Sequence, residues 1–285
     1  MRSRFQYFRP QTLKEALAFL ASHGAETSVL AGGTDLMILI RRGEITSNFV
    51  MDISRLDELR TVQKADAAIC VGAALTYTEI INDDVVNEFT PVLAEAAGYV
   101  GSVQIRNLGT LGGNAANASP AADSIPPILV HNGRVIIQSA SSERIEPLQD
   151  FIAGPYRTNL KPEELITGFL LEKDVGDYRY TFQRVARRKA LAVARINAAA
   201  VARLDSAGLV EDLRLSVGSI TPQPMRMSSA ENHLKGRRPD MATIREAAEK
   251  VTREMLRRSG VRPSTEYKQP AVEGLVIKVL SKVLF

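Results

Sequence analysis

The stretch SVLAGGTDLM, residues 28–37, takes the chain from a short apolar run into an apolar helix through two adjacent glycines. A second pair, Gly112-Gly113, follows in GTLGGN, residues 109–114. Glycine lets a ligand approach the backbone without a Cβ in the way, and it permits the positive φ that makes successive N–H groups converge. Each pair precedes a residue that favours helix N-caps, Thr34 and Asn114. These features are typical of a phosphate cradle made of backbone amides.

The simpler interpretation is that each glycine pair makes only a tight turn, because glycine-rich turns are common. No G-x-G-x-x-G follows the first strand, which disfavours a Rossmann dinucleotide site. The chain also lacks G-x-x-x-x-G-K-[ST], which disfavours a P-loop nucleotide hydrolase. The spacing alone leaves the choice between turns and a phosphate cradle open.

The composition indicates an ordinary globular protein, with 45% hydrophobic and 24% charged residues. A chain of 285 residues predicts two or three modules. No stretch approaches the roughly 18 uninterrupted apolar residues of a membrane span. The basic N-terminus, MRSRFQYFRP, lacks the apolar core of a signal peptide. We therefore expect a cytoplasmic protein with no membrane span.

Cysteine and histidine are too scarce for most metal chemistry. Cys70 is the single cysteine, so the chain cannot form an internal disulfide or hold a zinc or iron–sulfur site that needs several thiolates. The apolar run around it predicts a buried structural thiol. His23, His131 and His233 are widely scattered. We predict no metal site and no catalytic nucleophile or base on this chain.

The net charge of +4 comes mainly from the C-terminal half. No aromatic residues are interleaved with these charges, which disfavours nucleic-acid binding and favours a solvated or partner-facing surface. The basic residues in question are Arg184, Arg187, Arg188, Lys189, Arg195, Arg203, Lys235, Arg237 and Arg238.

Hydrophobic periodicity predicts three regions. The first, residues 1–57, is a small βαβαβ unit with a helix beginning after Thr12 and a second helix at 36–40 that is apolar nearly all round and therefore predicted to be buried. The second, 58–173, has strands at 59–63, 67–71, 134–138 and 164–170 and helices at 77–81 and 91–97. The third, 174–285, has strands at 180–185, 192–204 and 213–217, and helices at 229–234, 243–256 and 266–284. A sheet flanked by helices is expected there, and the whole chain is α+β.

Three motifs resemble the FAD-binding subunit of the molybdenum hydroxylases, a family that includes xanthine, aerobic carbon monoxide and nicotinate dehydrogenases. They are VLAGGTDLM, QIRNLGTLGGNAANASPAAD and the opening F-x-Y-x-R-P-x-T-L-x-E-A. YRTNLKPEELIT, TPQPMRMSSAENHLKG and STEYKQPAVEGLVIKVL extend the resemblance over almost the whole chain. It implies a two-subdomain FAD-binding domain of the vanillyl-alcohol-oxidase (PCMH) type, followed by a C-terminal α+β domain.

The resemblance also implies that FAD, held non-covalently, lies between the two subdomains with its diphosphate between the glycine loops. The implied FAD-binding residues are Val29, Leu30, Ala31, Gly32, Gly33, Thr34, Asp35, Leu36, Thr110, Leu111, Gly112, Gly113, Asn114, Asp123 and Ile166. Read from the residues alone, Asp35 complements a helix dipole and Asp123 is equally suited to cap a turn.

Two positions depart from the family pattern. Leu191 stands where relatives often carry an acidic residue, and Val100 stands where relatives place an aromatic against the isoalloxazine ring. The resemblance therefore does not extend to the contacts beside the flavin ring or to the identity of the electron acceptor.

By resemblance, this chain is an electron-transfer subunit whose chemistry belongs to its cofactor. A partner molybdopterin subunit hydroxylates the substrate, [2Fe-2S] clusters on a small subunit carry electrons to FAD, and NAD⁺ or another acceptor takes them. We expect the basic C-terminal half, with Arg187 and Arg188, to contribute to the partner contact. Two alternatives remain: a self-contained FAD-dependent oxidase, disfavoured by the scarcity of histidine and cysteine, and an interaction subunit without flavin.

Overall fold

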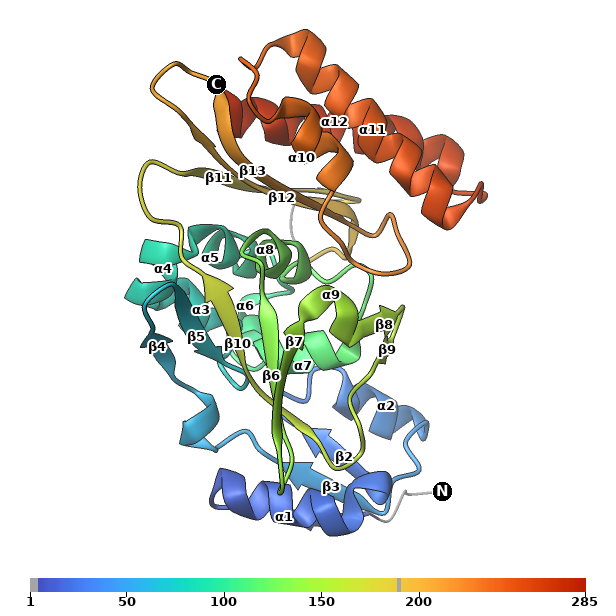
Figure 1. Cartoon of the computed structure of the whole chain (residues 1–285). Coiled ribbons are helices and arrows are strands. Elements are labelled where there is room, and N and C mark those ends of the chain that lie inside the picture. The colour runs from blue at the N-terminus through green and yellow to red at the C-terminus, as the bar shows by residue number, and fades with distance from the viewer. Residues whose placement is uncertain (1–4, 189–190) are drawn as a thin grey trace.

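The computed structural model describes residues 5–188 and 191–285. Lys189, one of the basic residues named above, lies outside the described residues, as do the first four residues of the basic stretch MRSRFQYFRP. The elements form three tiers stacked along one axis (Figure 1). The N-terminal tier contains the first three strands, the middle tier a five-stranded sheet, and the C-terminal tier a three-stranded sheet under long helices.

The N-terminal tier is the predicted βαβαβ unit. Its strands pair in parallel in the order β1-β3-β2. As predicted, Thr12 caps the first helix, accepting a hydrogen bond from the Glu15 N–H. The elements are β1 (Gln6–Phe8), α1 (Leu13–His23), the 3₁₀ helix η1 (Gly24–Glu26), β2 (Thr27–Leu30), α2 (Leu36–Arg42) and β3 (Phe49–Asp52).

The prediction that the second helix is buried was wrong. No residue of α2 is buried, and Met37 and Ile38 are 38% and 47% exposed. A helix of seven residues has only one face toward the rest of the protein. Leu36 and Leu39 occupy that face and line the cleft described below. The uniformly apolar sequence therefore leaves an apolar face exposed.

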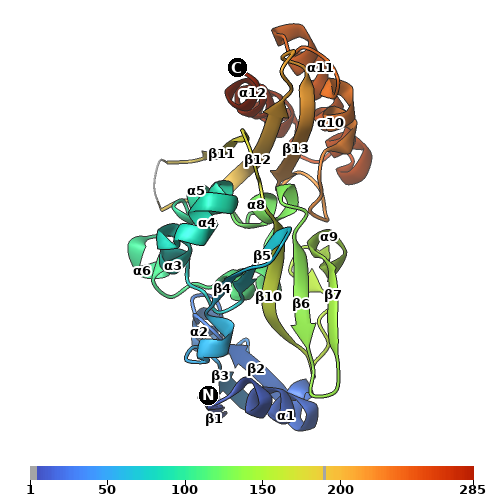
Figure 2. The ribbon, with the colours of Figure 1, turned by 60° about the vertical axis from the view of Figure 1, so that its left-hand side comes forward.

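The middle tier is built on an antiparallel sheet with the strand order β4-β5-β10-β6-β7. Figure 2 shows α3, α4, α5 and α6 gathered on one side of this sheet. The strands are β4 (Val62–Lys64), β5 (Ala68–Gly72), β6 (Arg134–Gln138), β7 (Glu143–Pro147) and β10 (Leu165–Glu172). The helices are η2 (Asp57–Leu59), α3 (Tyr77–Asn82), α4 (Asp84–Phe89), α5 (Pro91–Ala97), α6 (Val103–Arg106), α7 (Leu111–Asn117), α8 (Ile125–Val130) and α9 (Leu148–Phe151), and a small hairpin joins β8 (Ile152–Gly154) to β9 (Arg157–Thr158).

The three-region division with boundaries at 57/58 and 173/174 stays a prediction. The core around α1 contains Leu59, Ala74 and Leu165 as well as residues of the N-terminal tier.

Cys70, on β5, is half-buried, and burial raises the pKa of its thiol. A thiol with a raised pKa carries less of the nucleophilic thiolate, as the structural interpretation expects.

The C-terminal tier is the predicted sheet flanked by helices. Its strands are β11 (Arg179–Ala186), β12 (Ala194–Leu204) and β13 (Val210–Gly218), paired antiparallel in that order. Its helices are α10 (Ser228–Leu234), α11 (Met241–Ser259) and α12 (Thr265–Leu284). These helices cover one face of the sheet, and α5 and α8 of the middle tier lie against the other (Figure 1).

Alternation along β12 explains how one sheet serves two cores. Ala198 and Ala200 pack with the helices of the C-terminal tier, whereas Ala199 and Val201 pack with Val92 and the middle tier. Successive strand side chains point to opposite faces, so a strand covered on both sides needs apolar residues throughout. The small alanines allow both layers to approach closely.

A buried ionic network also joins these tiers. Arg214, on β13, donates from Nη1 to the Val130 carbonyl at 2.8 Å and from Nη2 to Asp174 Oδ1 at 2.5 Å. His131 lies beside this pair, with Nδ1 3.5 Å from Asp174 Oδ2. Burial, with the charge of Arg214, lowers the pKa of His131 to about 3, and burial raises that of Asp174 to about 6. His131 is therefore neutral at physiological pH.

We predict that Arg214→Ala destabilises the protein by about 3–5 kcal/mol, because it leaves the buried Asp174 carboxylate without its partner. Arg203→Ala is the matched control. Arg203 also lies over the Tyr178 ring, but its ion pair with Glu211 is exposed and the change should have little effect. Urea unfolding of both variants measures the difference, and equal losses would contradict this account.

Candidate functional site

The two glycine motifs of the sequence come together at one cleft of about 320 Å³. The first loop, residues 31–36 between β2 and α2, forms one wall, and the second loop with the start of α7 forms the other. Of the implied site residues, those that line the cleft are Val29, Ala31, Gly32, Gly33, Thr34, Asp35, Leu36, Thr110, Gly113 and Asn114. Motifs eighty residues apart (112 minus 32) thus share one surface.

The first loop offers backbone donors to the cleft. Among the residues that the structure describes, no hydrogen-bond acceptor is recorded for the N–H groups of residues 32–36. Gly33 has φ of +69°, the left-handed conformation that brings successive amides toward one point. Such a run of amides is suited to an anionic oxygen-rich group.

Gly32 is where the walls touch. A Cβ on Gly32 would lie 1.9 Å from the Leu108 carbonyl oxygen and 3.0 Å from Gly109 Cα. No side chain can occupy that space, so only glycine permits this backbone-to-backbone approach. Asn117 adds a second link between the walls, donating from Nδ2 to Asp35 Oδ1 at 3.4 Å.

The second loop differs because its amides are already used. The N–H of Leu111 bonds the Leu75 carbonyl and that of Gly112 the Ala73 carbonyl, while Gly113 N–H bonds Thr110 Oγ1. A Cβ on Gly112 would lie 2.7 Å from Ala73 Cβ, so this glycine serves close packing. The second loop therefore acts as a rigid wall.

Both cap assignments drawn from the glycine pairs were wrong. Helix α2 begins at Leu36 with Asp35 in the N-cap position, not Thr34. Helix α7 begins before its glycines, at Leu111, and Thr110 caps it through its hydroxyl. Thr110 has the extended backbone of an N-cap, so the glycines fall in the first helical turn and Asn114 lies inside the helix.

Three implied residues are directed elsewhere. The Leu30 side chain packs beside Gly33 of its own loop, where its Cδ1 lies 2.9 Å from the position that a Cβ on Gly33 would occupy. Leu111 and Ile166 are buried in the core cluster of the middle tier. They do not line the glycine cleft, although Leu111 positions the start of α7.

Asp123 is held in a buried polar cluster that reaches across the tiers. Its Oδ2 accepts from Arg184 Nη1 at 2.7 Å and its Oδ1 from Asn197 Nδ2 at 2.8 Å. Burial raises the pKa of Asp123, against the opposing effects of Asn197 and Arg184. Arg184 in turn lies over the Tyr99 ring. The Asp123 carboxylate thus fastens the segment after α7 to strands β11 and β12.

Sequence reasoning missed several residues of the cleft. Asn114 connects the second loop to the segment that contains Asp123, because its Oδ1 accepts a hydrogen bond from Ser124 Oγ at 2.7 Å. Ser124 Oγ also lies 3.3 Å from the hydroxyl of Tyr77, which lines the cleft. The predicted Tyr77 helix gave no sign of facing the cleft, whereas Gly109, three positions before Gly112, was a usable signal. The further lining residues are Leu39, Tyr77, Ile105, Gly109, Ala116 and Asn117, together with Val100, the position that the resemblance had placed beside the isoalloxazine ring.

Comparison with known families assigns both parts of the chain. Residues 3–171 match the model described as the FAD binding domain in molybdopterin dehydrogenase. Residues 181–283 match the CO dehydrogenase flavoprotein C-terminal domain. The chain belongs to the family of FAD-binding subunits of molybdopterin dehydrogenases. This FAD-binding subunit is an oxidoreductase subunit, as its resemblance implied.

Full-length relatives agree with that assignment. The subunit is 31% identical over 283 residues to the glyceraldehyde dehydrogenase medium chain of Sulfolobus acidocaldarius, covering 98% of each chain. It is also 31% identical to the xanthine dehydrogenase FAD-binding subunit of Escherichia coli O157:H7, covering 98% of this chain and 95% of that one.

Solved structures show the same fold. A chain of carbon monoxide dehydrogenase from Hydrogenophaga pseudoflava superposes with a TM-score of 0.91 at 24% identity, covering 99% of this subunit and 98% of that chain. A chain of the reconstituted CO dehydrogenase from Oligotropha carboxidovorans gives 0.92 at 22% identity, covering 100% and 99%. The α+β fold with an FAD-binding domain and a C-terminal domain is confirmed. In the described residues, no helix is long and apolar enough to cross a membrane.

The residues of the cleft fit FAD. The diphosphate of FAD needs donors that accept close approach, and the first loop supplies N–H groups without intrachain acceptors beside a glycine that no other residue can replace. Neither histidine nor cysteine lines the cleft among the described residues, which agrees with non-covalent binding.

We predict that Gly32→Ala lowers FAD affinity at least tenfold, because its Cβ would force the Leu108 backbone away from the first loop. Gly274→Ala on α12 is the control, since a Cβ there meets nothing within 4 Å and alanine should stabilise the helix by about 0.5–1 kcal/mol. Fluorescence titration of the flavin-free variants with FAD measures both affinities. Equal affinities would contradict the role of the contact between the loops.

Proposed function

We propose that the N–H groups of residues 32–36 bind the FAD diphosphate and that the Thr110–Asn114 segment closes the cleft over it. The observation that carries this proposal is the set of backbone donors without an intrachain acceptor, held where the two glycine loops touch. Val29 and Ala31 extend the first wall, and Leu30 stays a proposed contact outside the cleft. Asp123 and Ile166 stay proposed contacts of the flavin nucleotide beyond the cleft.

We further propose that the chain is the electron-transfer subunit of a three-component molybdenum hydroxylase. Relatives are named as a medium chain, as an FAD-binding subunit and as a subunit of a dehydrogenase complex, which supports assembly with other subunits. In this proposal a small subunit carries the iron–sulfur clusters and a large subunit carries the molybdenum cofactor. One cysteine on this chain is consistent with placing the clusters elsewhere.

When bound, FAD would supply the redox chemistry, a route for electrons from the partner's clusters to NAD⁺ or another acceptor. The chain's own residues bind and orient the cofactor. The first loop positions the diphosphate, and the Asp123–Arg184–Asn197 cluster fixes the next segment against the C-terminal sheet. We propose that regions 1–57 and 58–173 bind FAD and that region 174–285 contributes to the contact with the partner subunits.

The purified chain should show flavin absorption bands, and mild denaturation should release FAD at about one per chain. Chromatography of the released chromophore identifies it, and a flavin retained by the denatured protein would favour the self-contained oxidase with a covalent link. A chain that stays colourless when co-expressed with its partners and supplied with FAD would contradict the flavin function and favour the interaction subunit.

The charge reversal Arg187→Glu/Arg188→Glu should weaken co-purification with the partner subunits if the basic surface after β11 contacts them. Both arginines are exposed, and Arg188 Nε also donates to the Leu191 carbonyl at 2.9 Å. The control Arg245→Glu/Arg253→Glu makes the same charge change on the exposed face of α11. Unchanged assembly of the first variant, with an unchanged melting temperature, would exclude this surface.

A further inference from the structure

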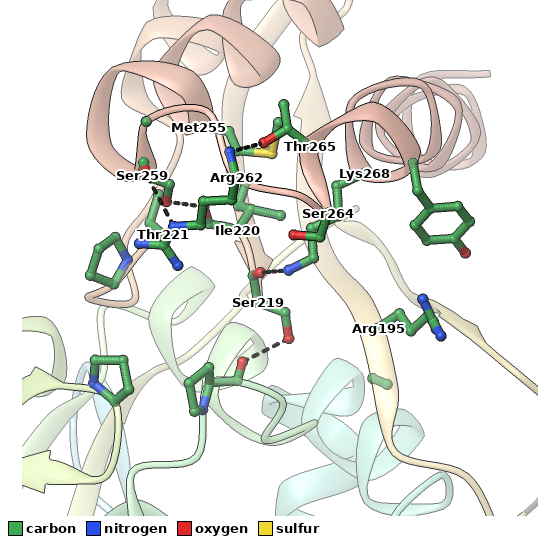
Figure 3. A pocket seen from close by; sticks show the side chains of 16 residues that line it. Arg195, Ser219, Ile220, Thr221, Met255, Ser259, Arg262, Ser264, Thr265 and Lys268 are labelled. Atoms are coloured by element: carbon green, nitrogen blue, oxygen red, sulfur yellow. Dashed lines mark hydrogen bonds between the residues drawn. The ribbon is translucent and has the colours of Figure 1, made fainter.

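A second cavity, of about 380 Å³, lies between the C-terminal tier and the loops of the middle tier (Figure 3). The start of β12, the segment after β13 and the connection from α11 to α12 form most of it, and Pro120 and Pro155 from loops of the middle tier complete it. Its volume is within the range of small-molecule sites. It shares no lining residue with the glycine cleft.

The charged residues that line this cavity are all cations: Arg195, Arg262 and Lys268. No carboxylate lines it, and in residues 5–188 and 191–285 none of the three forms an ion pair within 4.0 Å. Three cations gathered without counter-charge repel one another, so the arrangement gains energy when an anion enters.

Lys268 points into the cavity from the first turns of α12 (Figure 3). Its Nζ donates to the Ser219 carbonyl at 2.5 Å, and an ammonium group has further N–H donors to offer. Burial lowers the pKa of Lys268, and the charges of Arg262 and Arg195 add to that effect. The side chain is thus half-buried in a positive environment.

The two arginines also keep donors available. Arg262 uses Nε to bond the Ser259 carbonyl at 3.0 Å, which orients its guanidinium and leaves both terminal nitrogens without an acceptor among the described residues. Arg195 stacks over the Tyr267 ring at 5.2 Å. Guanidinium and ammonium groups together are the usual protein ligands of phosphate.

The rest of the wall combines apolar side chains with hydroxyl-bearing ones. Ile220, Pro222 and Met255, together with Pro120 and Pro155, lie around the cationic group. A cavity that presents cationic and hydroxyl groups together with apolar side chains is typical of a site for a small organic anion.

We propose that this cavity binds the phosphate group of a small molecule, through Lys268, Arg262 and Arg195. Inorganic phosphate and a phosphate ester share this chemistry, and the apolar side chains of the lining are suited to the organic part of an ester. Because Ser219 Oγ donates to the Pro120 carbonyl at 3.0 Å, occupancy bears on the segment that leads from α7 to Asp123.

Isothermal titration calorimetry of the full chain, saturated with FAD so that the glycine cleft does not contribute, tests the proposal. The probes are inorganic phosphate, glycerol 3-phosphate and adenosine 5′-monophosphate, with glycerol and adenosine as phosphate-free controls. Lys268→Gln and Arg262→Gln should each weaken phosphate binding at least about tenfold. The matched controls are Lys278→Gln on α12 and Arg245→Gln on α11. Both positions are exposed and lie outside the cavity, so each control should change the affinity for phosphate less than about twofold.

Tighter binding of an ester than of inorganic phosphate would support the site and identify an ester as its ligand, whereas equal binding would support the site with free phosphate as its ligand. No binding of any probe, or binding that the Lys268 and Arg262 variants leave unchanged, would overturn the proposal. Loss of partner assembly in these variants without small-anion binding would assign the cavity to an acidic segment of a partner instead. If the chain does not take up FAD, the phosphate affinities of the Lys268→Gln and Lys278→Gln variants are still compared, so a failure of the proposed FAD site is distinguishable from a failure of this proposal.

Discussion

The approach of the Gly32 backbone to the Leu108–Gly109 backbone is the constraint on which the glycine cleft depends. A Cβ at Gly32 would sit 1.9 Å from a carbonyl oxygen, so the N-terminal tier and the middle tier meet there without a side chain between them. A similar contact recurs along the same boundary. A Cβ on Gly24 would lie 2.2 Å from the carbonyl oxygen of Pro162. Glycine therefore serves here to join two subdomains as much as to admit a ligand.

This constraint divides the work between the two glycine loops. The N–H groups of the second loop donate hydrogen bonds to the Leu75 and Ala73 carbonyls and to Thr110 Oγ1, and these bonds hold α7 against the middle-tier core. The first loop lies outside regular structure and keeps its amides for the cleft. A wall held by its own hydrogen bonds can position a mobile, charged group that the other wall binds. Rigidity and binding capacity thus come from different motifs, although both motifs look alike in the sequence.

The sequence predicted the elements whose apolar residues follow a regular period, because burial against one neighbour leaves that period. The βαβαβ unit, the long C-terminal helices and the flanked sheet are of this kind. Helix α2 is not, since an apolar sequence says how hydrophobic a face is and not whether anything covers it. The predicted cap of α7 was wrong for a related reason. Thr110 and Asn114 are both good capping residues, and only the hydrogen bond that the Gly113 N–H donates to Thr110 Oγ1 distinguishes them.

The contacts between tiers were beyond the sequence because they join residues with no local signature. Asp123 was a plausible turn cap or flavin contact, but its partners Arg184 and Asn197 lie on strands that begin more than fifty residues later. Burying such a charged cluster between layers costs desolvation energy, which is offset only when every partner is in place. The cluster therefore favours one orientation of the C-terminal sheet over all others. Asn117 lines the glycine cleft and Pro120 lines the cationic cavity, so the short segment that Asp123 fastens borders both. Any change at one surface must be accommodated by the same few residues that form the other.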